Sequence, residues 1–596
     1  MAAVPDEDDA LPGPWALRDY AFLGDGERGA LVGPRGEVVW MCVPRWHDDA
    51  VFAALLGGPG AYVVRPDDHR HVWGGFYEDG TLVHVSRWVT GGATGGAIVE
   101  CREALAAPAD GDRAVLLRRV RAVEGRAALR VRLDVRPGFG RAPAPRPRRD
   151  GGVWHGESGG VRFRWSGAPD AVAAPDGGLR TRLVLPEGAE HDLVLELRAG
   201  DAPYDPREPL DAAALWRATE EWWRSRVPGS AGLPDGLPGA KDVRHAYAVL
   251  NGLTSRAGGM VAAATTSLPE RARAGRNYDY RYVWLRDQAY AGLAVAAHGP
   301  HPLLDSAVRF ATDRILADGD ALHPAYTVEG GAVPGERHLG LPGYPGGGDR
   351  TGNLAARQFQ LDTFGEVLQL FAAAARHGRL DDDARRAVQV AVDAVRHRWT
   401  RPDAGLWEVE ERWWTHSRLS VVTGLRAVAR DVAGTAVPAW TELAEAILRE
   451  TRRRCLRPDG AWGRAEDDPG PDAGLLAPLA RGGLPPGDPS VGPTRELIAR
   501  ELSEDGFVYR FRHGPRPLGE DEGAFLLCGF TMAMAARREG DPVGAARWFE
   551  RGRAAYGTPG LFAEEYDVGQ RQLRGNLPQA FVHAALLEAS AALAAG

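Results

Sequence analysis

The stretch Tyr278-Asp279-Tyr280-Arg281-Tyr282-Val283-Trp284-Leu285-Arg286-Asp287 places aromatic rings and charges together at the start of a helical pattern that begins near residue 284. Comparable clusters precede the patterns that begin near residues 360, 417, 472, 522 and 577. Among twelve candidate helices, these are the even-numbered ones. The clusters therefore recur ahead of every second helix.

Helical periodicity runs from about Asp242 to the C-terminus, and the candidate helices begin near residues 242, 284, 302, 360, 381, 417, 438, 472, 491, 522, 541 and 577. Twelve helices taken in pairs can form an (α/α)6 barrel of six inner and six outer helices. The loops before the even-numbered helices would then meet at one end of the inner ring. Because binding groups usually lie on loops held by a rigid scaffold, we expect these clusters to share one pocket.

The first part of the chain has the period of β-strands. Short alternating runs occur at residues 36–40, 61–65, 81–88, 114–120, 128–135, 160–165, 179–185 and 193–198. This spacing predicts an N-terminal antiparallel β-sandwich over residues 1–205. Residues 206–240 are expected to be a linker with a short Trp-rich helix, Ala212 to Arg226. The all-α catalytic domain is expected over residues 241–596.

Composition narrows the class of protein. The chain has 596 residues, a net charge of -8 and four widely spaced cysteines. This balance disfavours a nucleic-acid partner, and the cysteines do not form a zinc motif. The N-terminus has no apolar signal segment, and no apolar run is long enough to span a membrane. We therefore expect a cytoplasmic enzyme without a membrane partner.

The expected pocket combines Trp, Tyr, Arg and carboxylates. The sequence has no HExxH, no GxxxxGK[ST] and no GxSxG motif, so we expect no metal and no cofactor. Aromatic faces stack on the apolar faces of sugar rings, and guanidinium and carboxylate groups bind hydroxyls. Two facing carboxylates would supply the acid and base of a glycosidase.

At these residues the sequence resembles glycoside hydrolase family 15, the glucoamylase family, in its bacterial form. The resemblance covers almost the whole chain, and the order and spacing of the matching stretches make it specific. These stretches are residues 20–25, 40–45 and 51–56 in the first part, and residues 265–270, 276–287, 360–362, 407–408, 415–417, 522–528 and 564–581 in the helical part.

The resemblance implies an inverting, exo-acting hydrolase that releases β-glucose from the non-reducing end of a small oligosaccharide or glucoside. It implies that Glu408 is the general acid and Glu564 the general base. Arg286 and Asp287 fall where the family holds the hydroxyls of the non-reducing sugar. Arg510 falls where a further arginine binds sugar, and Tyr280 where an aromatic residue lies near the nucleophilic water.

Some assignments remain open at this point. Glu565 adjoins Glu564 and is an alternative base. Trp407 is expected to line the pocket and to raise the pKa of Glu408. Glu522 is expected either to contact sugar or to begin the tenth helix. Arg286 and Asp287 have the alternative of being a structural ion pair at a helix start.

The substrate is the least determined part of the prediction. This sequence departs from the usual family pattern at His47, Tyr278, residues 344–350 and residues 409–414. The choices within the family are α-1,4 ends, α-1,6 ends and trehalose. Other candidates are a specialised-metabolite glycosidase, an α-glucoside phosphorylase, and a catalytically inactive carbohydrate-binding homologue. Because a phosphorylase needs only the acid, a Glu at position 564 argues against one.

Overall fold

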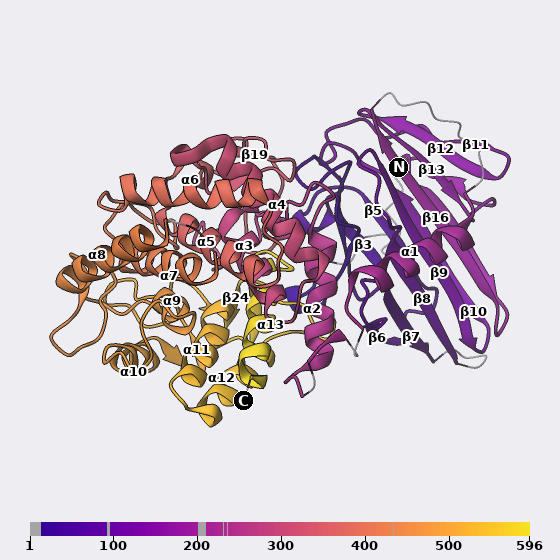
Figure 1. Cartoon of the computed structure of the whole chain (residues 1–596). Coiled ribbons are helices and arrows are strands. Elements are labelled where there is room, and N and C mark those ends of the chain that lie inside the picture. The colour runs from indigo at the N-terminus through magenta and orange to yellow at the C-terminus, as the bar shows by residue number, and fades with distance from the viewer. Residues whose placement is uncertain are drawn as a thin grey trace.

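The computed structural model describes residues 13–91, 96–200, 210–229, 232–234, 236–432, 434 and 436–595. A β-sheet domain is followed by a helical domain beside it (Figure 1). Residues 1–12, 92–95 and 201–205 of the expected sandwich and residues 206–209, 230, 231 and 235 of the expected linker lie outside the described residues.

The β domain consists of two antiparallel eight-stranded sheets. Apolar side chains of both sheets, such as Leu23 and Val64 from the first and Leu116 and Leu195 from the second, belong to one buried cluster. The first sheet has the order β1 (Ala21–Gly24), β2 (Gly29–Val32), β3 (Glu37–Cys42), β5 (Ala61–Pro66), β10 (Ala127–Asp134), β15 (Leu179–Leu185) and β14 (Val172–Ala173), with β4 (Ala50–Phe52) paired to β3. The second has the order β11 (Arg148–Asp150), β12 (Val153–Ser158), β13 (Val161–Ser166), β16 (Glu190–Ala199), β9 (Arg113–Glu124), β8 (Ala97–Leu105), β7 (His84–Thr90) and β6 (His71–Tyr77).

The helix expected in the linker is α1, which spans Ala212–Arg226. It packs on the second sheet, as Figure 1 shows. Trp216 Nε1 donates to Asp192 Oδ1 in β16 at 3.2 Å, and the backbone N–H of Ala107 donates to Thr219 Oγ1 at 3.1 Å. This part of the segment is therefore held against the β domain.

The helical domain begins with α2, and its helices start within a few residues of the expected positions. Their bounds are α2 (Ala240–Leu253), α3 (Leu285–Ala296), α4 (Pro302–Asp318), α5 (Leu361–Arg376), α6 (Asp382–Arg398), α7 (Thr415–Asp431), α8 (Val437–Cys455), α9 (Leu476–Ala480), α10 (Val491–Glu501), α11 (Leu526–Arg538), α12 (Pro542–Arg553) and α13 (Ala580–Ala594).

Every second helix belongs to a closed cycle of contacts. Helix α3 contacts α5, α5 contacts α7, α7 contacts α9, α9 contacts α11, α11 contacts α13, and α13 contacts α3. The other helices lie against these, for example α4 on α3 and α8 on α7. The cycle is made of the helices that follow the polar and aromatic clusters. None of the helices in the described ranges is long and apolar enough to cross a bilayer.

Candidate active site

Residues at the amino ends of inner helices line a pocket that we call the inner pocket. They lie at the starts of α3, α11 and α13 and in the segments that precede α3, α7, α11 and α13. The lining residues are Ala262, Tyr280, Trp284, Arg286, Asp287, Leu406, Trp407, Glu408, Arg510, Phe525, Leu527, Glu564, Gln579 and Phe581. Seven of the eight residues expected at the site are among them, and Glu522 is the exception.

Glu408 lies in the loop between α6 and α7, in the left-handed backbone conformation with φ 56°. Gly405 makes the preceding turn at φ 66°, where a Cβ atom would lie 2.6 Å from the Trp414 ring. The Glu408 Oε1 atom accepts hydrogen bonds from Trp284 Nε1 at 2.7 Å, Gln360 Nε2 at 3.0 Å and Arg286 Nη2 at 3.3 Å. These donors fix one oxygen and leave Oε2 as the atom available to a ligand.

Arg286 and Asp287 are in the first turn of α3, and both are buried. The Arg286 guanidinium also donates from Nη1 to Gln360 Oε1 at 3.0 Å and lies 3.8 Å from Asp287 Oδ2. Burial raises the pKa of Asp287 to about 7, against the opposing effect of Arg286. The Asp287 Oδ2 atom is itself buried and accepts no hydrogen bond from any described residue.

The structure separates the two adjacent glutamates by position. A three-stranded sheet of β23 (Ala524–Phe525), β24 (Glu565–Asp567) and β25 (Gln572–Arg574) holds this segment at the start of α11. Glu564 immediately precedes β24 and lines the inner pocket. Glu565 is fully buried and does not line it, and its Oε2 accepts the backbone N–H of Gly523 at 2.7 Å.

Tyr280 connects Glu564 to a third carboxylate, Glu270. Its hydroxyl lies 3.1 and 3.3 Å from the two oxygens of Glu564 and 3.4 Å from Glu270 Oε1. Burial raises the pKa of Glu564 well above its usual value, and the neighbouring Glu270 raises it further, while Arg510 and Tyr280 lower it. Burial likewise raises the pKa values of Glu270 and Glu565.

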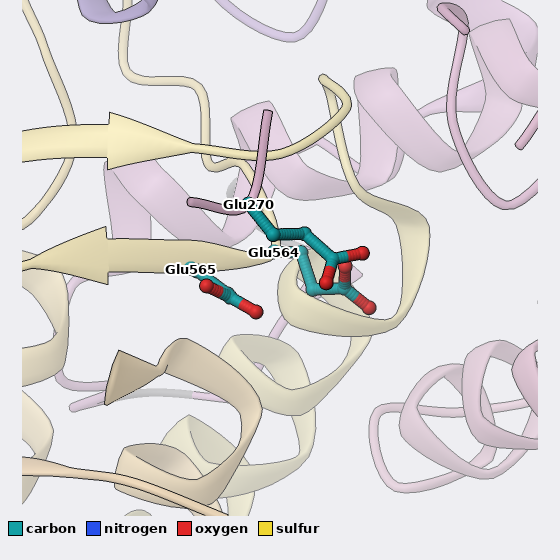
Figure 2. A group of neighbouring side chains, drawn as sticks. All are labelled: Glu270, Glu564 and Glu565. Carbon is teal, nitrogen blue, oxygen red and sulfur yellow. The ribbon is translucent and has the colours of Figure 1, made fainter. Parts of the chain in front are cut away.

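The oxygens of these three glutamates are close enough together to be considered as metal ligands. Atoms of Glu270, Glu564 and Glu565 all lie within 4.8 Å of one another, and all three residues are buried. Figure 2 shows the carboxyl ends of Glu270 and Glu564 side by side, with that of Glu565 next to them.

Arg510 and Glu522 form an ion pair beside the pocket. Arg510 Nε donates to Glu522 Oε2 at 2.8 Å, and the same oxygen contacts His513 Nε2 at 2.8 Å and Arg276 Nη1 at 3.1 Å. Burial favours the neutral form of Glu522, but Arg510 and His513 lower its pKa to about 2. Glu522 is therefore placed to hold Arg510, and the structure puts it behind the pocket wall.

Trp407 lines the inner pocket, and its indole N–H bonds to a residue outside the loop that carries Glu408. Its Nε1 donates to Asp472 Oδ1 at 2.8 Å, and its ring meets Phe525 edge to face with centroids 5.4 Å apart. The tryptophan that donates to Glu408 is Trp284. The clusters before α3 and α9 therefore support the loop that carries Glu408.

A second pocket, the outer pocket, adjoins the first. It shares Tyr280, Trp407, Glu408, Arg510 and Glu564 with the inner pocket. Its other lining residues are mostly polar: Glu270, Arg276, Tyr278, Glu336, Arg350, Asn353, Leu354, Ala355, Gln358 and Val409. Three positions where the sequence departs from the usual pattern, namely Tyr278, Arg350 and Val409, lie in this outer pocket.

Several functional residues were not singled out from the sequence. Trp284 and Gln360 hold Glu408, and Glu270 lies beside Glu564. All three lie inside stretches that carry the family resemblance. Their position in these stretches is the sequence signal that could identify them. Gln579 and Phe581 at the start of α13 complete the wall of the inner pocket.

Comparisons with known proteins match both domains. The model for "Glycosyl hydrolases family 15" matches residues 244–591, and that for "Trehalase-like, N-terminal" matches residues 14–223. A trehalase from Mycobacterium tuberculosis is 31% identical over 96% of this chain and 89% of its own length. Trehalase 1 from Sulfolobus acidocaldarius is 27% identical over 96% of this chain and 98% of its own.

Two further similarities differ in extent. An isomaltose glucohydrolase from Kribbella flavida is 28% identical over 51% of this chain and 77% of its own. The solved structure of a bacterial glucoamylase complexed with acarbose has a TM-score of 0.68 at 13% identity, covering 98% of this chain and 96% of that one. The overall fold is therefore similar to that of a glucoamylase.

Proposed function

The chain belongs to glycoside hydrolase family 15, and from this premise we propose that it hydrolyses α,α-trehalose with inversion at the attacked carbon. Glu408 is the general acid and Glu564 the general base in this proposal. The relatives that match along nearly the whole chain are trehalases, which favours trehalose over other α-glucosides. The closed cycle of inner helices is, in this proposal, the inner ring of an (α/α)6 barrel over residues 241–596, behind an N-terminal domain over residues 1–205.

The observation that carries the proposal is the position of the two carboxylates where the pockets meet. Glu408 and Glu564 line both the inner and the outer pocket. A disaccharide with one ring in each pocket has its glycosidic bond at that junction. An inverting glycosidase needs its acid and base at this bond, on opposite faces of the sugar.

The hydrogen bonds of Glu408 distinguish its two oxygens. Trp284, Gln360 and Arg286 all donate to Oε1, so Oε2 is the oxygen that carries the proton in this proposal. In the reaction Glu408 gives this proton to the glycosidic oxygen as the bond from that oxygen to C1 breaks. The leaving glucose departs with its own anomeric configuration unchanged.

On the opposite face, Glu564 takes a proton from the attacking water while the water oxygen bonds to C1. Tyr280 lies against both Glu564 oxygens and orients the carboxylate. Arg286 and Asp287 bind hydroxyls of the sugar in the inner pocket, and Phe581 and Trp284 present apolar surface to its ring. Arg510 lines both pockets and supports the base electrostatically.

The reaction has an anomeric signature specific to trehalose. Inversion at one carbon yields one β-glucose, and the leaving glucose is α, so fresh product contains both anomers in equal amounts. Proton NMR in H2¹⁸O, followed by mass analysis of each anomer, should find the label in β-glucose alone. Exclusively α product would contradict inversion, and glucose 1-phosphate formed in phosphate buffer would indicate a phosphorylase.

Substitutions test the two carboxylates separately. Glu408→Gln and Glu564→Gln should each lower kcat by about 10²–10⁴-fold, the usual contribution of a general acid or base, with KM nearly unchanged. Glu565→Gln is the matched control, because Glu565 has the same chemistry and adjoins Glu564 but does not line the pocket. If Glu565→Gln is the inactive variant and Glu564→Gln is active, the base has been assigned to the wrong residue.

Isomaltose is the second candidate substrate because an isomaltose glucohydrolase matches about half of the chain. A screen of trehalose, isomaltose, maltose and maltotriose by kcat/KM separates the possibilities. We expect trehalose to be preferred. Binding of a sugar without turnover by the unmodified chain would indicate a carbohydrate-binding homologue.

A further inference from the structure

We propose that Glu270 is a positioning residue for the base: it shares one proton with Glu564 through the Tyr280 hydroxyl and holds that proton while Glu564 is ionised. This inference deepens the proposed function and rests on Glu564 being the base. Its starting point is the group of buried glutamates in Figure 2, whose oxygens lie within 4.8 Å of one another.

The Tyr280 hydroxyl fixes the direction of the hydrogen bonds. It lies 3.1 Å from one oxygen of Glu564 and 3.4 Å from Glu270 Oε1. A hydroxyl has one proton to donate, so it cannot donate to two carboxylates at once. When Tyr280 donates to ionised Glu564, Glu270 satisfies the same hydroxyl only by donating its own proton to the Tyr280 oxygen.

The surrounding charges leave too few cations for all the carboxylates. Arg510 contacts Glu522 at 2.7 Å, and Arg276 is nearer to Glu522, at 3.1 Å, than to Glu270, at 3.7 Å. Arg510, together with His513, lowers the pKa of Glu522 and keeps it ionised. The remaining three glutamates are buried at short range, where like charges favour retention of a proton.

Other titratable groups near the three glutamates do not supply the missing positive charge. Tyr278, Tyr280, Asp287 and Glu408 carry none. Arg350, which also lines the outer pocket, pairs there with Glu336 at 3.4 Å. Glu565 differs from Glu270 in its contacts, since it accepts the Gly523 N–H and has no contact with the Tyr280 hydroxyl among the described hydrogen bonds. Glu270 is therefore the carboxyl linked to the base.

The shared proton allows Glu564 to return to its ionised state after each turnover. Before attack, Glu270 carries the proton and Glu564 is ionised. As the water oxygen bonds to C1, a water proton passes to Glu564. Glu270 lines the outer pocket and releases its own proton to solvent there. The proton on Glu564 then passes to the Tyr280 oxygen as the Tyr280 proton passes to Glu270, which restores the starting state.

The pH dependence of kcat/KM, which reports the free enzyme, tests the inference. Glu270→Leu removes the donor to Tyr280, so ionised Glu564 is less stable and its pKa rises. The acid limb of the profile should move up by about one pH unit, as expected for one lost hydrogen bond. Glu270→Gln retains an N–H donor, so its acid limb should stay at the wild-type position.

An ionised Glu270 predicts that the acid limb moves in the opposite direction. If Glu270 is ionised when Glu564 is ionised, both substitutions remove a negative charge, lower the pKa of Glu564 and move the acid limb to lower pH. That result would overturn the proposal, as would unmoved limbs in both variants. Tyr280→Phe, which interrupts the link, should move the limb in the same direction as Glu270→Leu.

Infrared spectroscopy tests the proton without any activity measurement. Near neutral pH, the wild type should show the carbonyl stretch of a protonated carboxylic acid, and the Glu270→Gln difference spectrum should show its loss. An unchanged band would overturn the proposal. So would calorimetric binding of Mg²⁺ at the three glutamates that Glu270→Gln abolishes, because a cation would replace the shared proton. If Glu564→Gln keeps its activity, the proposed function fails, while the infrared result still decides where the proton is.

Discussion

At the scale of single residues, Asp362 is a buried carboxyl group beneath the inner pocket. It occupies the second position of α5, and neither of its oxygens accepts a hydrogen bond from a described residue. Its closest ion-pair contact is Arg286 Nη1 at 3.8 Å. Burial raises the pKa of Asp362 to about 7 despite Arg286. The folded protein therefore binds a proton that the unfolded chain releases near pH 4.

This proton makes stability depend on pH with a definite sign. Between about pH 4 and 7 Asp362 is protonated in the folded state and ionised in the unfolded state, so its contribution to the free energy of unfolding falls as pH rises. Asp362→Asn removes that dependence. The free energy of unfolding of the variant should therefore rise relative to that of the wild type as pH rises from about 4 to 7. The total change should be on the order of 4 kcal/mol. Thermal midpoints measured in steps of pH would show this, and a constant difference between the proteins would contradict it.

A second aspartate provides the contrast. Burial opposes ionisation of Asp431, but Arg430 and Arg376 more than offset it and lower its pKa. Its ionisation therefore stabilises the folded protein, and the contribution disappears as pH falls below about 4. Asp431→Asn should lose stability relative to the wild type as pH rises through that acid range, the opposite sign to Asp362→Asn.

The site residues show what a sequence can and cannot predict at this scale. The pattern Gly-Leu-Trp-Glu and the stretch from Glu564 pointed to residues that do line one pocket. Glu270 was not identified, because a glutamate in a loop is usually exposed and its burial depends on segments about 290 residues away. The partner of Trp407 was also missed, because Asp472 comes close only through the fold.

At the scale of elements, α5 and α7 approach closely because small residues face each other. A Cβ atom added at Gly365 would lie 2.4 Å from the backbone carbon of Ser420, and one at Gly424 would lie 2.5 Å from the Gly365 carbonyl oxygen. The obstructing atoms are backbone, so they cannot move aside as a flexible side chain could. This contact sets the spacing of two neighbouring inner helices.

Gly365→Ala should therefore destabilise the helical domain by about 1–3 kcal/mol, the usual cost of overpacking. Gly529→Ala is the matched control, because Gly529 lies inside α11, also an inner helix, and a Cβ atom there meets nothing within 4 Å. It should be neutral or stabilise the protein by up to about 1 kcal/mol. Thermal unfolding of the two variants tests this difference. Equal midpoints would show that the close contact between α5 and α7 tolerates an added methyl group.

The helices and strands differ in how well their sequence predicted them. Long helices such as α5 and α7 have a regular apolar period and began near the expected residues. Helix α9 has only five residues and directly follows a 3-10 turn over Ala473–Leu475 that Asp472 caps. The strands β23 and β24, which carry the segment with Glu564, are too short to show a period of two.

At the scale of the whole molecule, the β domain directly supports the loop that carries Tyr280. The Arg281 side chain is fully buried and pairs with Asp279, with Nη2 at 2.8 Å from Oδ2. Its Nη1 donates to the carbonyl oxygens of Asp48 at 2.9 Å and Trp46 at 3.2 Å, which belong to the β domain. The two domains also share an apolar cluster that includes Trp40 and Leu268. We therefore expect them to unfold together.

Arg281→Met tests this coupling because it leaves Asp279 buried without its cation. Removing one partner of a buried ion pair costs about 3–5 kcal/mol, so calorimetry should show a lower midpoint. The variant should also show two transitions, in place of the single one that we expect of the wild type. The kcat/KM should fall at least about tenfold, since Tyr280 adjoins the lost anchor.

Asp279→Asn combined with Arg281→Met should recover part of the stability but not the activity, because the bonds to Trp46 and Asp48 stay absent. Arg386→Met on the exposed face of α6 is the control and should change stability by less than about 0.5 kcal/mol. Wild-type activity in Arg281→Met would mean that the β domain does not position the loop that carries Tyr280.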